Sequence, residues 1–255
     1  MKCYLFVALA SILSLLAGIA LCCGYSEPTA STDTKAKALI VDQLSNIWPN
    51  EGFISEVTKE LEDYGFDVYV YQGKDISVKF YRELPENGYK LIIFRAHSGV
   101  LKRAGGTYLF TDEAYSKTKY GLEQLTGQML EVTITEDYPT VFAVNSRFIQ
   151  NSINGEFQDA VIIMMGCSTT YMTDMAEAFA QKGASVYVGW CASVVLDYVD
   201  EATPSLITNL CTEDMTLEKA LNQTMAEVGP DPDYHAYLKY HPASAGNKTL
   251  DELIR

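Results

Sequence analysis

Short apolar runs alternate with longer segments of helical periodicity from residue 37 onward. The compact run Lys37–Asp42 is followed by Gly52–Gly65, whose apolar residues recur at the spacing of an amphipathic helix that ends at its glycine. The runs Asp67–Gly73 and Tyr89–Gly99 predict two further strands, and Ile76–Leu84 predicts a helix between them. This alternation is typical of parallel strands joined by right-handed crossovers, and the continuous apolar runs indicate strands covered on both faces.

The stretch from Val100 to about residue 158 breaks this alternation. Its β-rich runs GTYLFTD, QMLEVTI and PTVFAVN are separated by paired glycines and by a proline, so we predict an inserted hairpin or loop region. The alternation then returns, and the chain after Gly229 is predicted to be an irregular loop. The later elements are a strand from Ala160, a helix from Tyr171, a strand ending at Trp190, and helices near 202–210 and 216–228.

The N-terminus is predicted to be a targeting segment. The stretch from Tyr4 to Cys23 carries no charge and reaches the roughly 20 residues that a membrane-spanning helix needs. Cys22 or Cys23 would be the site of lipidation in a bacterial lipoprotein, but the small residue normally found before the modified cysteine is absent. We therefore expect an extracytoplasmic protein, secreted or held at the membrane through this segment only. The predicted organisation is a signal peptide or membrane anchor over 1–23, a polar linker over 24–36 and one folded domain over 37–255.

Charge narrows the range of partners. The 255 residues include 19 Lys and Arg against 33 Asp and Glu, a net charge of −14. Such a surface repels phosphate backbones, so we expect no nucleic-acid partner. An acidic surface favours a cationic substrate, although it also serves solubility alone. It could hold calcium, but three widely spaced histidines and no Cys-x-x-Cys pair argue against a zinc site, and no cofactor is required by the chemistry considered next.

Reactive side chains stand at the ends of predicted strands. His97, Cys167 and Trp190 end three of them, and the carboxyl ends of parallel strands lie along one edge of a sheet, where ligands bind. A nearby imidazole can activate a thiol and later protonate a leaving amine, so Cys167 is the candidate nucleophile and His97 the candidate general acid and base. Ser168 to Thr170 would cap the following helix, whose N-terminus would favour the thiolate.

A backbone site for a developing oxyanion is predicted beside these two residues. The N–H of Cys167 is one candidate donor, and the second is the N–H of Ser98 or of Gly99. A glycine at position 166 lets the chain approach a substrate closely.

The two motifs resemble those of the caspase-like cysteine peptidases of clan CD. In that superfamily a hydrophobic strand ends in His then Gly, and a later one ends in Gly-Cys or Ala-Cys; here the segments read IIFRAHSG and IIMMGCSTT. The second motif and AEAFAQKGASVYVGW look most like separases and CHAT domains, and the order of motifs is also that of gingipains and legumains. Ser98 departs from the pattern, because it stands between the histidine and the glycine.

The resemblance implies a fold, an activity and a substrate class. The fold would be a three-layer α/β/α sandwich with a mostly parallel caspase-like sheet, and the activity would be that of a cysteine endopeptidase acting on peptides or proteins with His97 and Cys167. Relatives that cleave after Arg or Lys carry an acidic residue in the pocket. Candidate pocket residues here are Asp42, Trp190, Asp197 and Asp200.

Two alternatives remain at this stage. Cys167 and Cys191 follow strands that are expected to be neighbours, so they could form a disulfide that silences the nucleophile. The domain could instead be a non-catalytic caspase-like module that binds a partner or peptide at the cell surface. Reactivity of Cys167 toward thiol-directed probes distinguishes these alternatives from the peptidase.

Overall fold

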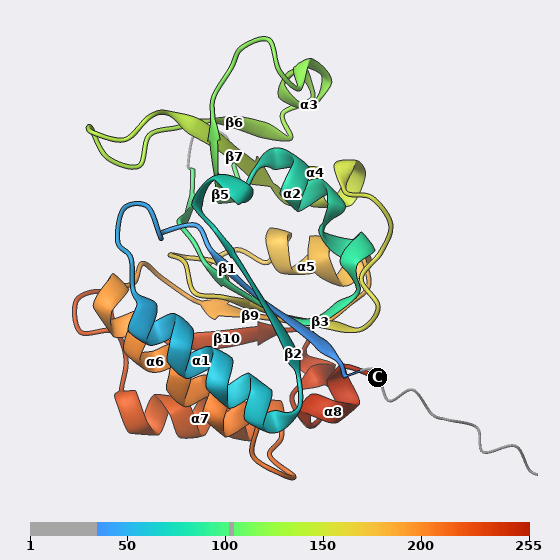
Figure 1. The fold of residues 1–255 in the computed structure, drawn as a ribbon, viewed down its shortest axis with the longest axis vertical. Helices are drawn as coiled ribbons and strands as arrows, with labels where there is room; N and C mark the ends of the chain where they lie inside the picture. The colour runs from blue at the N-terminus through green and yellow to red at the C-terminus, as the bar shows by residue number, and fades with distance from the viewer. Residues whose placement is uncertain (1–34, 102–104) are drawn as a thin grey trace, which may run out of the picture. The chain divides into compact units, whose positions relative to one another are not determined.

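A six-stranded, mostly parallel sheet organises the domain in this computed structural model, which describes residues 35–101 and 105–255. Its strand order is β10-β9-β8-β3-β1-β2, and only β10 runs antiparallel to its neighbour (Figure 1). The strands are β1 (Lys37–Asp42), β2 (Asp67–Gln72), β3 (Tyr89–Arg95), β8 (Ala160–Met164), β9 (Ala184–Trp190) and β10 (Leu238–His241).

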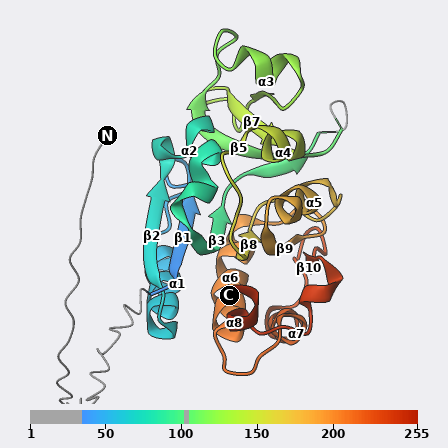
Figure 2. The same ribbon diagram turned by 90° about the vertical axis from the view of Figure 1, so that its right-hand side faces the viewer.

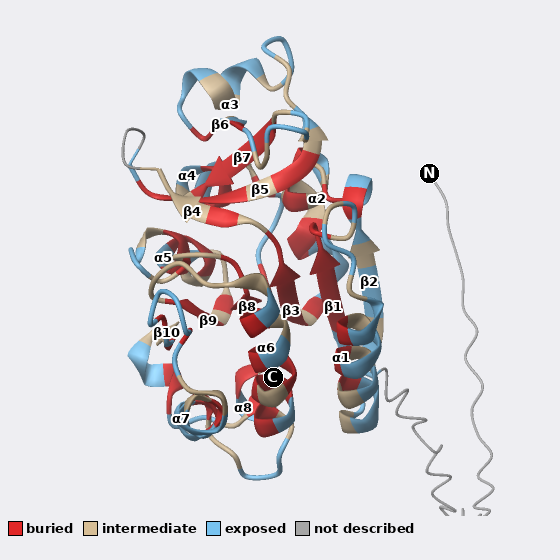
Figure 3. Cartoon of the chain, turned by 90° about the vertical axis from the view of Figure 1, so that its left-hand side faces the viewer, coloured by how far each residue is buried: buried red, intermediate tan, exposed pale blue. Residues whose placement is uncertain are grey.

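Helices cover both faces of this sheet, which explains its continuous apolar strands. Successive residues of β3 point to opposite faces, so Ile93 joins one hydrophobic cluster and Ile92 the other. Figure 3 shows β1 and β3 buried along most of their length. The residues of the edge strand β2 are exposed or intermediate. One face packs against α1 (Glu51–Tyr64), α6 (Leu196–Leu210) and α7 (Leu217–Val228), and the other against α2 (Val78–Glu83), α4 (Ser146–Ser152) and α5 (Asp174–Gln181).

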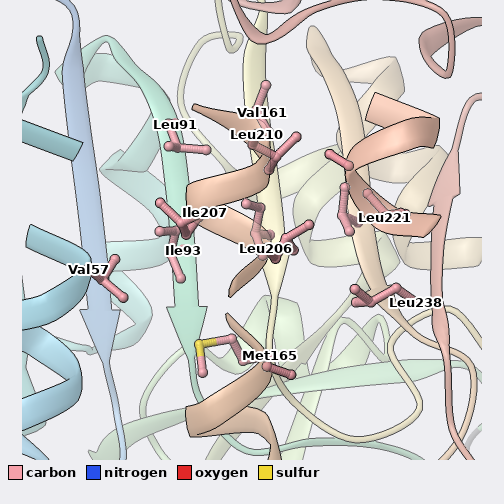
Figure 4. Packing of buried hydrophobic residues seen from close by; sticks show 14 of the residues in the cluster. Val57, Leu91, Ile93, Val161, Met165, Leu206, Ile207, Leu210, Leu221 and Leu238 are labelled. Carbon is pink, nitrogen blue, oxygen red and sulfur yellow. The ribbon is translucent and has the colours of Figure 1, made fainter. Parts of the chain in front are cut away.

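Local signals set the ends of several helices. The side chain of Asn50 accepts a hydrogen bond from the N–H of Phe53 at 3.0 Å and so begins α1, while Gly65, with φ of 119°, ends it in the left-handed region. Figure 4 shows the side chains of α6 packed among those of β3 and β8. The predicted three-layer α/β/α sandwich with a mostly parallel sheet is therefore confirmed.

The predicted insertion forms a second sheet, which is four-stranded and antiparallel, in the order β4-β5-β7-β6. Leu109, Phe142 and Val144 on one of its faces join the hydrophobic cluster of α2, α4 and α5. Figures 1 and 2 show α5 between this second sheet and β9. Its elements are β4 (Ser98–Val100), β5 (Thr107–Ala114), α3 (Gly121–Leu125), β6 (Met129–Val132) and β7 (Val141–Asn145).

The C-terminal region differs from the predicted loop. It contains β10, which pairs with β9, and α8 (Leu250–Leu253), which begins with a capping box between Thr249 and Glu252. A four-residue edge strand carries too little periodicity to be recognised alone, and pairing with β9 defines it. Short 3₁₀ turns occupy Gly73–Asp75, Leu84–Asn87 and Ala243–Ala245.

The predicted targeting segment 1–23 and most of the predicted linker, residues 24–34, lie outside the described residues. Residues Lys35–Arg255 form one compact unit. Within residues 35–101 and 105–255, no helix combines the length and apolar character needed to cross a membrane.

Candidate active site

Strand register brings His97 and Cys167 to one place. Phe94 of β3 pairs with Met164 of β8, and the two candidate residues follow at equal distances along their strands. Neighbouring strands lie about 4.8 Å apart, so equivalent positions just beyond them are adjacent. Both residues line one cavity of about 340 Å³, here called the strand-end pocket. The structure thus brings together the two residues that the sequence analysis selected.

The imidazole of His97 is held by its backbone and by aromatic neighbours. The backbone N–H of His97 donates to Oε1 of Gln43 at 3.0 Å, and its backbone carbonyl accepts from the N–H of Phe110 at 3.0 Å. The ring lies 5.3 Å from that of Trp48 and 5.9 Å from that of Phe110, centroid to centroid. Nε2 is buried and has no hydrogen-bond partner among the described residues.

Burial lowers the pKa of His97 from 6.5 to about 4, because the charged imidazolium loses water without gaining a counter-charge. The imidazole is therefore neutral at neutral pH and able to accept a proton. No carboxylate among the described residues is hydrogen-bonded to either of its ring nitrogens.

This burial predicts a specific dependence of stability on pH. Between pH 6.5 and pH 4 the unfolded chain binds a proton at His97 and the folded chain does not, so the free energy of unfolding falls as pH falls. The loss from pH 7 to pH 4 should be about 3 kcal/mol. Urea unfolding at both pH values should show this extra loss in wild type relative to His97→Gln. The exposed His235 provides the control, because His235→Asn should lose as much as wild type. Equal losses in wild type and His97→Gln would contradict the assignment.

The sulfur of Cys167 is held by one peptide segment. Its Sγ accepts a hydrogen bond from the N–H of Val194 at 3.5 Å and lies 3.6 Å from the carbonyl oxygen of Val194, to which the thiol can donate. The carbonyl of Cys167 accepts from Oγ of Ser98 at 2.9 Å, which links the loop of His97 to that of Cys167. Among the described residues, none of the hydrogen bonds of Sγ goes to His97. The two groups therefore share the pocket without a preformed ion pair.

Glycine is required directly before Cys167. A Cβ at Gly166 would lie 2.5 Å from the carbonyl oxygen of Ala96 and 2.2 Å from Oγ of Ser98. Backbone at such a distance cannot move aside cheaply, so any larger residue would push the Cys167 loop away from the His97 loop.

The helix expected to support the thiolate begins too late to do so. The sequence places a helix start at Tyr171, whereas α5 begins at Asp174, and residues 166–173 form turns and bends. The N–H of Ser168, in the left-handed region with φ of 57°, donates instead to the carbonyl of Ala192 at 2.8 Å. The helix start that lines the pocket is that of α6, through Leu196 and Asp197.

The ladder between β4 and β5 distinguishes the two candidate oxyanion donors. Phe110 N–H binds the carbonyl of His97, and hydrogen-bonded pairs alternate along an antiparallel ladder. Gly99, two residues on, therefore has its N–H directed at β5, while that of Ser98 points away from it. The N–H of Cys167 has no acceptor among the described residues. The available pair is thus Ser98 and Cys167.

Two of the four predicted pocket residues serve a buried ion cluster instead. Arg95 is 1% exposed; its Nη1 lies 2.8 Å from Asp42, and its Nε and Nη2 lie 2.7 and 2.8 Å from Asp200. Neither carboxylate lines the strand-end pocket, although Arg95 does. Arg95 was not predicted as a functional residue, although it ends the same strand, β3, that leads to His97.

The other two predicted pocket residues lie in different surroundings. Trp190 is 1% exposed and packs against the ring of Tyr198 at 5.4 Å, so it belongs to the core and does not wall the pocket. Asp197 lines the pocket and is exposed. Leu44, Trp48, Met165, Val194 and Val199 supply most of the remaining wall, which is apolar.

The alternative disulfide is not formed. Cys167, Cys191 and Cys211 are all free thiols, and Sγ of Cys191 accepts a hydrogen bond from the N–H of Tyr237 at 3.4 Å. Over residues 35–101 and 105–255, no group of three His, Cys, Asp or Glu side chains could hold a metal ion.

Comparison with known proteins gives only distant structural likeness. No family model and no curated protein matches the chain. Among solved structures, the crystal structure of the Arg-specific cysteine proteinase gingipain R is similar with a TM-score of 0.47 and 10% identity. The match covers 86% of this chain and 45% of that one, so the chain spans less than half the length of that structure. The fold class therefore rests on the layers and sheet order described above.

Proposed function

We propose that this protein is a cysteine endopeptidase with Cys167 as nucleophile and His97 as general acid and base. The observation that carries the proposal is the arrangement of a free thiol and a neutral imidazole at equivalent ends of adjacent strands, facing one apolar pocket. The resemblance of the two motifs to caspase-like peptidases supports the same reaction. We further propose that the protein acts outside the cytoplasm, because of its apolar N-terminal segment.

The residues fit the steps of thiol-dependent peptide hydrolysis. His97 takes the thiol proton as Sγ of Cys167 attacks the scissile carbonyl carbon, and the N–H groups of Ser98 and Cys167 stabilise the oxyanion. The imidazolium then protonates the leaving amine as the C–N bond breaks, leaving a thioester. Water attacks the thioester with His97 as base, which releases the carboxylic acid product and restores the thiol.

Selective labelling of the thiol tests this proposal. A peptidyl acyloxymethyl ketone should modify Cys167 in reduced, folded protein and leave Cys191 and Cys211 unmodified, as mass spectrometry of the digested protein can show. Absence of selective modification at Cys167 would favour the non-catalytic binding module.

A preference for basic residues before the scissile bond is the expected specificity. Apolar walls suit the aliphatic stem of Arg or Lys, and the carboxylate of Asp197 can meet its charge. The ion cluster of Arg95 with two carboxylates adds a net charge of −1 beneath the pocket. Peptides with Arg or Lys at this position should be cleaved, and those with Asp should not.

Substitution of the pocket carboxylate should separate these substrates. Asp197→Asn is expected to lower kcat/KM for Arg peptides by about fivefold and to leave that for Leu peptides unchanged, because one exposed charge pair contributes about 1 kcal/mol. The remote exposed Glu213, changed to Gln, is the control and should alter neither. A preference for Asp over Arg peptides in wild type would contradict the proposed specificity.

A further inference from the structure

We propose that Asp231 is a positioning residue for the nucleophile, acting through Val195 and Val194 on the sulfur of Cys167. The proposal rests on the peptidase function above but concerns a residue that neither binds substrate nor lines the strand-end pocket.

Asp231 is a buried carboxylate held by backbone donors alone. It is 0% exposed, and its Oδ2 accepts from the N–H of Val195 at 2.7 Å. Its Oδ1 accepts from the N–H of Asp233 at 3.0 Å and from that of Tyr234 at 2.7 Å. No lysine, arginine or histidine among the described residues forms a salt bridge with it. Burying a carboxylate is costly unless hydrogen bonds replace its water, and three N–H donors do so here.

These donors need an acceptor at both oxygens of the side chain. A carboxylate only accepts hydrogen bonds, so both of its oxygens suit N–H groups that approach from two sides. An asparagine would offer one oxygen and one NH₂ group. The NH₂ group would face a backbone N–H, and that N–H would lose its acceptor. The side chain at 231 therefore determines whether the N–H of Val195 has an acceptor.

Val195 is directly linked to the group that holds the sulfur. It is the N-cap residue of α6 and follows Val194, whose N–H lies 3.5 Å and whose carbonyl oxygen lies 3.6 Å from Sγ of Cys167. The other end of the same segment is held by the loop that contains Asp231, because the backbone N–H of Cys191 donates to the carbonyl of Tyr237 at 3.1 Å. The segment 191–195 is thus fixed between the loop of Asp231 and the loop of the nucleophile.

Loss of the Asp231 contact should therefore alter the reactivity and position of the Cys167 sulfur while the overall fold is kept. An N–H donor at Sγ stabilises the thiolate, so displacement of Val194 would weaken this support and move the sulfur from its place of attack. Displacements of about 1 Å at a reacting atom can cost roughly 10²-fold in rate.

The test compares Asp231→Asn with a matched substitution elsewhere. Asp174→Asn makes the same chemical change in a carboxylate that also accepts three hydrogen bonds, from the N–H and hydroxyl of Thr107 and the hydroxyl of Ser146. Asp174 does not line the pocket. Asp231→Asn should lower kcat by about 10²-fold with little change in KM. It should also shift the pH profile of Cys167 alkylation by iodoacetamide to higher pH, slowing the reaction at pH 7 by about tenfold. Asp174→Asn should leave the profile unchanged.

A second variant tests the same link from the other side. Val195→Pro removes the N–H that Asp231 binds, and φ of −80° at Val195 suits proline. It should reproduce the alkylation shift, and the double variant Asp231→Asn/Val195→Pro should be no worse than the more impaired single one. Val195→Pro also keeps the proposal testable if Asp231→Asn fails to fold.

The outcomes separate this inference from the proposed function. If Asp231→Asn and Val195→Pro lower the melting temperature but keep the wild-type alkylation profile, Asp231 has only a structural role and the inference is overturned. Alkylation is measured without a peptide substrate, so a protein that cleaves no peptide would refute the proposed function while still testing the role of Asp231.

Discussion

Replacing Cys167 with alanine is expected to lower kcat/KM by about 10⁴-fold or more while leaving the fold intact. The side chain is half-buried, and among the described residues its sulfur forms hydrogen bonds with the backbone of Val194 alone, so its removal opens little space. The nucleophile forms the covalent intermediate, and without it only binding and oxyanion stabilisation remain. Steady-state cleavage of an Arg peptide and a thermal melt on the same preparation measure both effects.

Two other cysteines provide controls for this experiment. Cys191→Ala and Cys211→Ala remove free thiols that the mechanism does not use, and each should retain most of the wild-type kcat/KM. Burial raises the pKa of Cys211 to about 12, so this thiol should also react slowly with alkylating agents at neutral pH. If Cys167→Ala kept wild-type activity, or if Cys191→Ala lost it instead, the assignment of the nucleophile would be wrong.

Replacing Arg95 with methionine is expected to lower the free energy of unfolding by about 3–5 kcal/mol. The change leaves the buried carboxylate of Asp42 and the mostly buried carboxylate of Asp200 without their cation. A buried charge without a partner destabilises a protein by more than the intact ion pair stabilises it. Urea unfolding at pH 7 measures the loss. Because Arg95 also lines the pocket, activity should fall together with stability.

Two comparisons isolate the buried charges as the cause. The triple variant Arg95→Met/Asp42→Asn/Asp200→Asn removes all three charges and should recover most of the stability. Lys59→Met breaks the exposed pair with Asp63, whose side chains are 75% and 64% exposed, and should cost about 0.5 kcal/mol or less. A loss of about 1 kcal/mol or less in Arg95→Met would contradict the role of the buried cluster.

The sequence predicted the fold best where an element is defined by a pattern within its own residues. The strands β1, β3, β8 and β9 are continuous apolar runs, and α1 has a clear periodicity with a glycine at its end, so these elements and their parallel order were predictable. The order of strands also brought His97 and Cys167 to one edge. This step needed only the rule that parallel strands end on the same side.

Contacts between distant segments account for what could not be predicted. Asp42 and Asp200 looked like pocket residues because both are acidic and near strand ends, but the partner that buries them, Arg95, lies 53 and 105 positions away from them along the chain. The start of α6 at Leu196 depends on a hydrogen bond from the N–H of Val195 to Asp231. The loop that carries Asp231 was predicted only as irregular. The second sheet could not be predicted for the same reason, because its strands are short, weakly periodic runs that are defined by pairing with one another.

The sulfur of Cys167 is held by the backbone N–H and carbonyl of Val194, while Val194 also forms part of the pocket wall. Peptide groups are the same in every residue except proline, so substitutions at this position can widen or narrow the cavity without touching the support of the thiol. Selectivity and reactivity are thus encoded by different atoms of one residue. Substitutions at Val194 could therefore alter substrate selectivity and leave the reactivity of Cys167 unchanged.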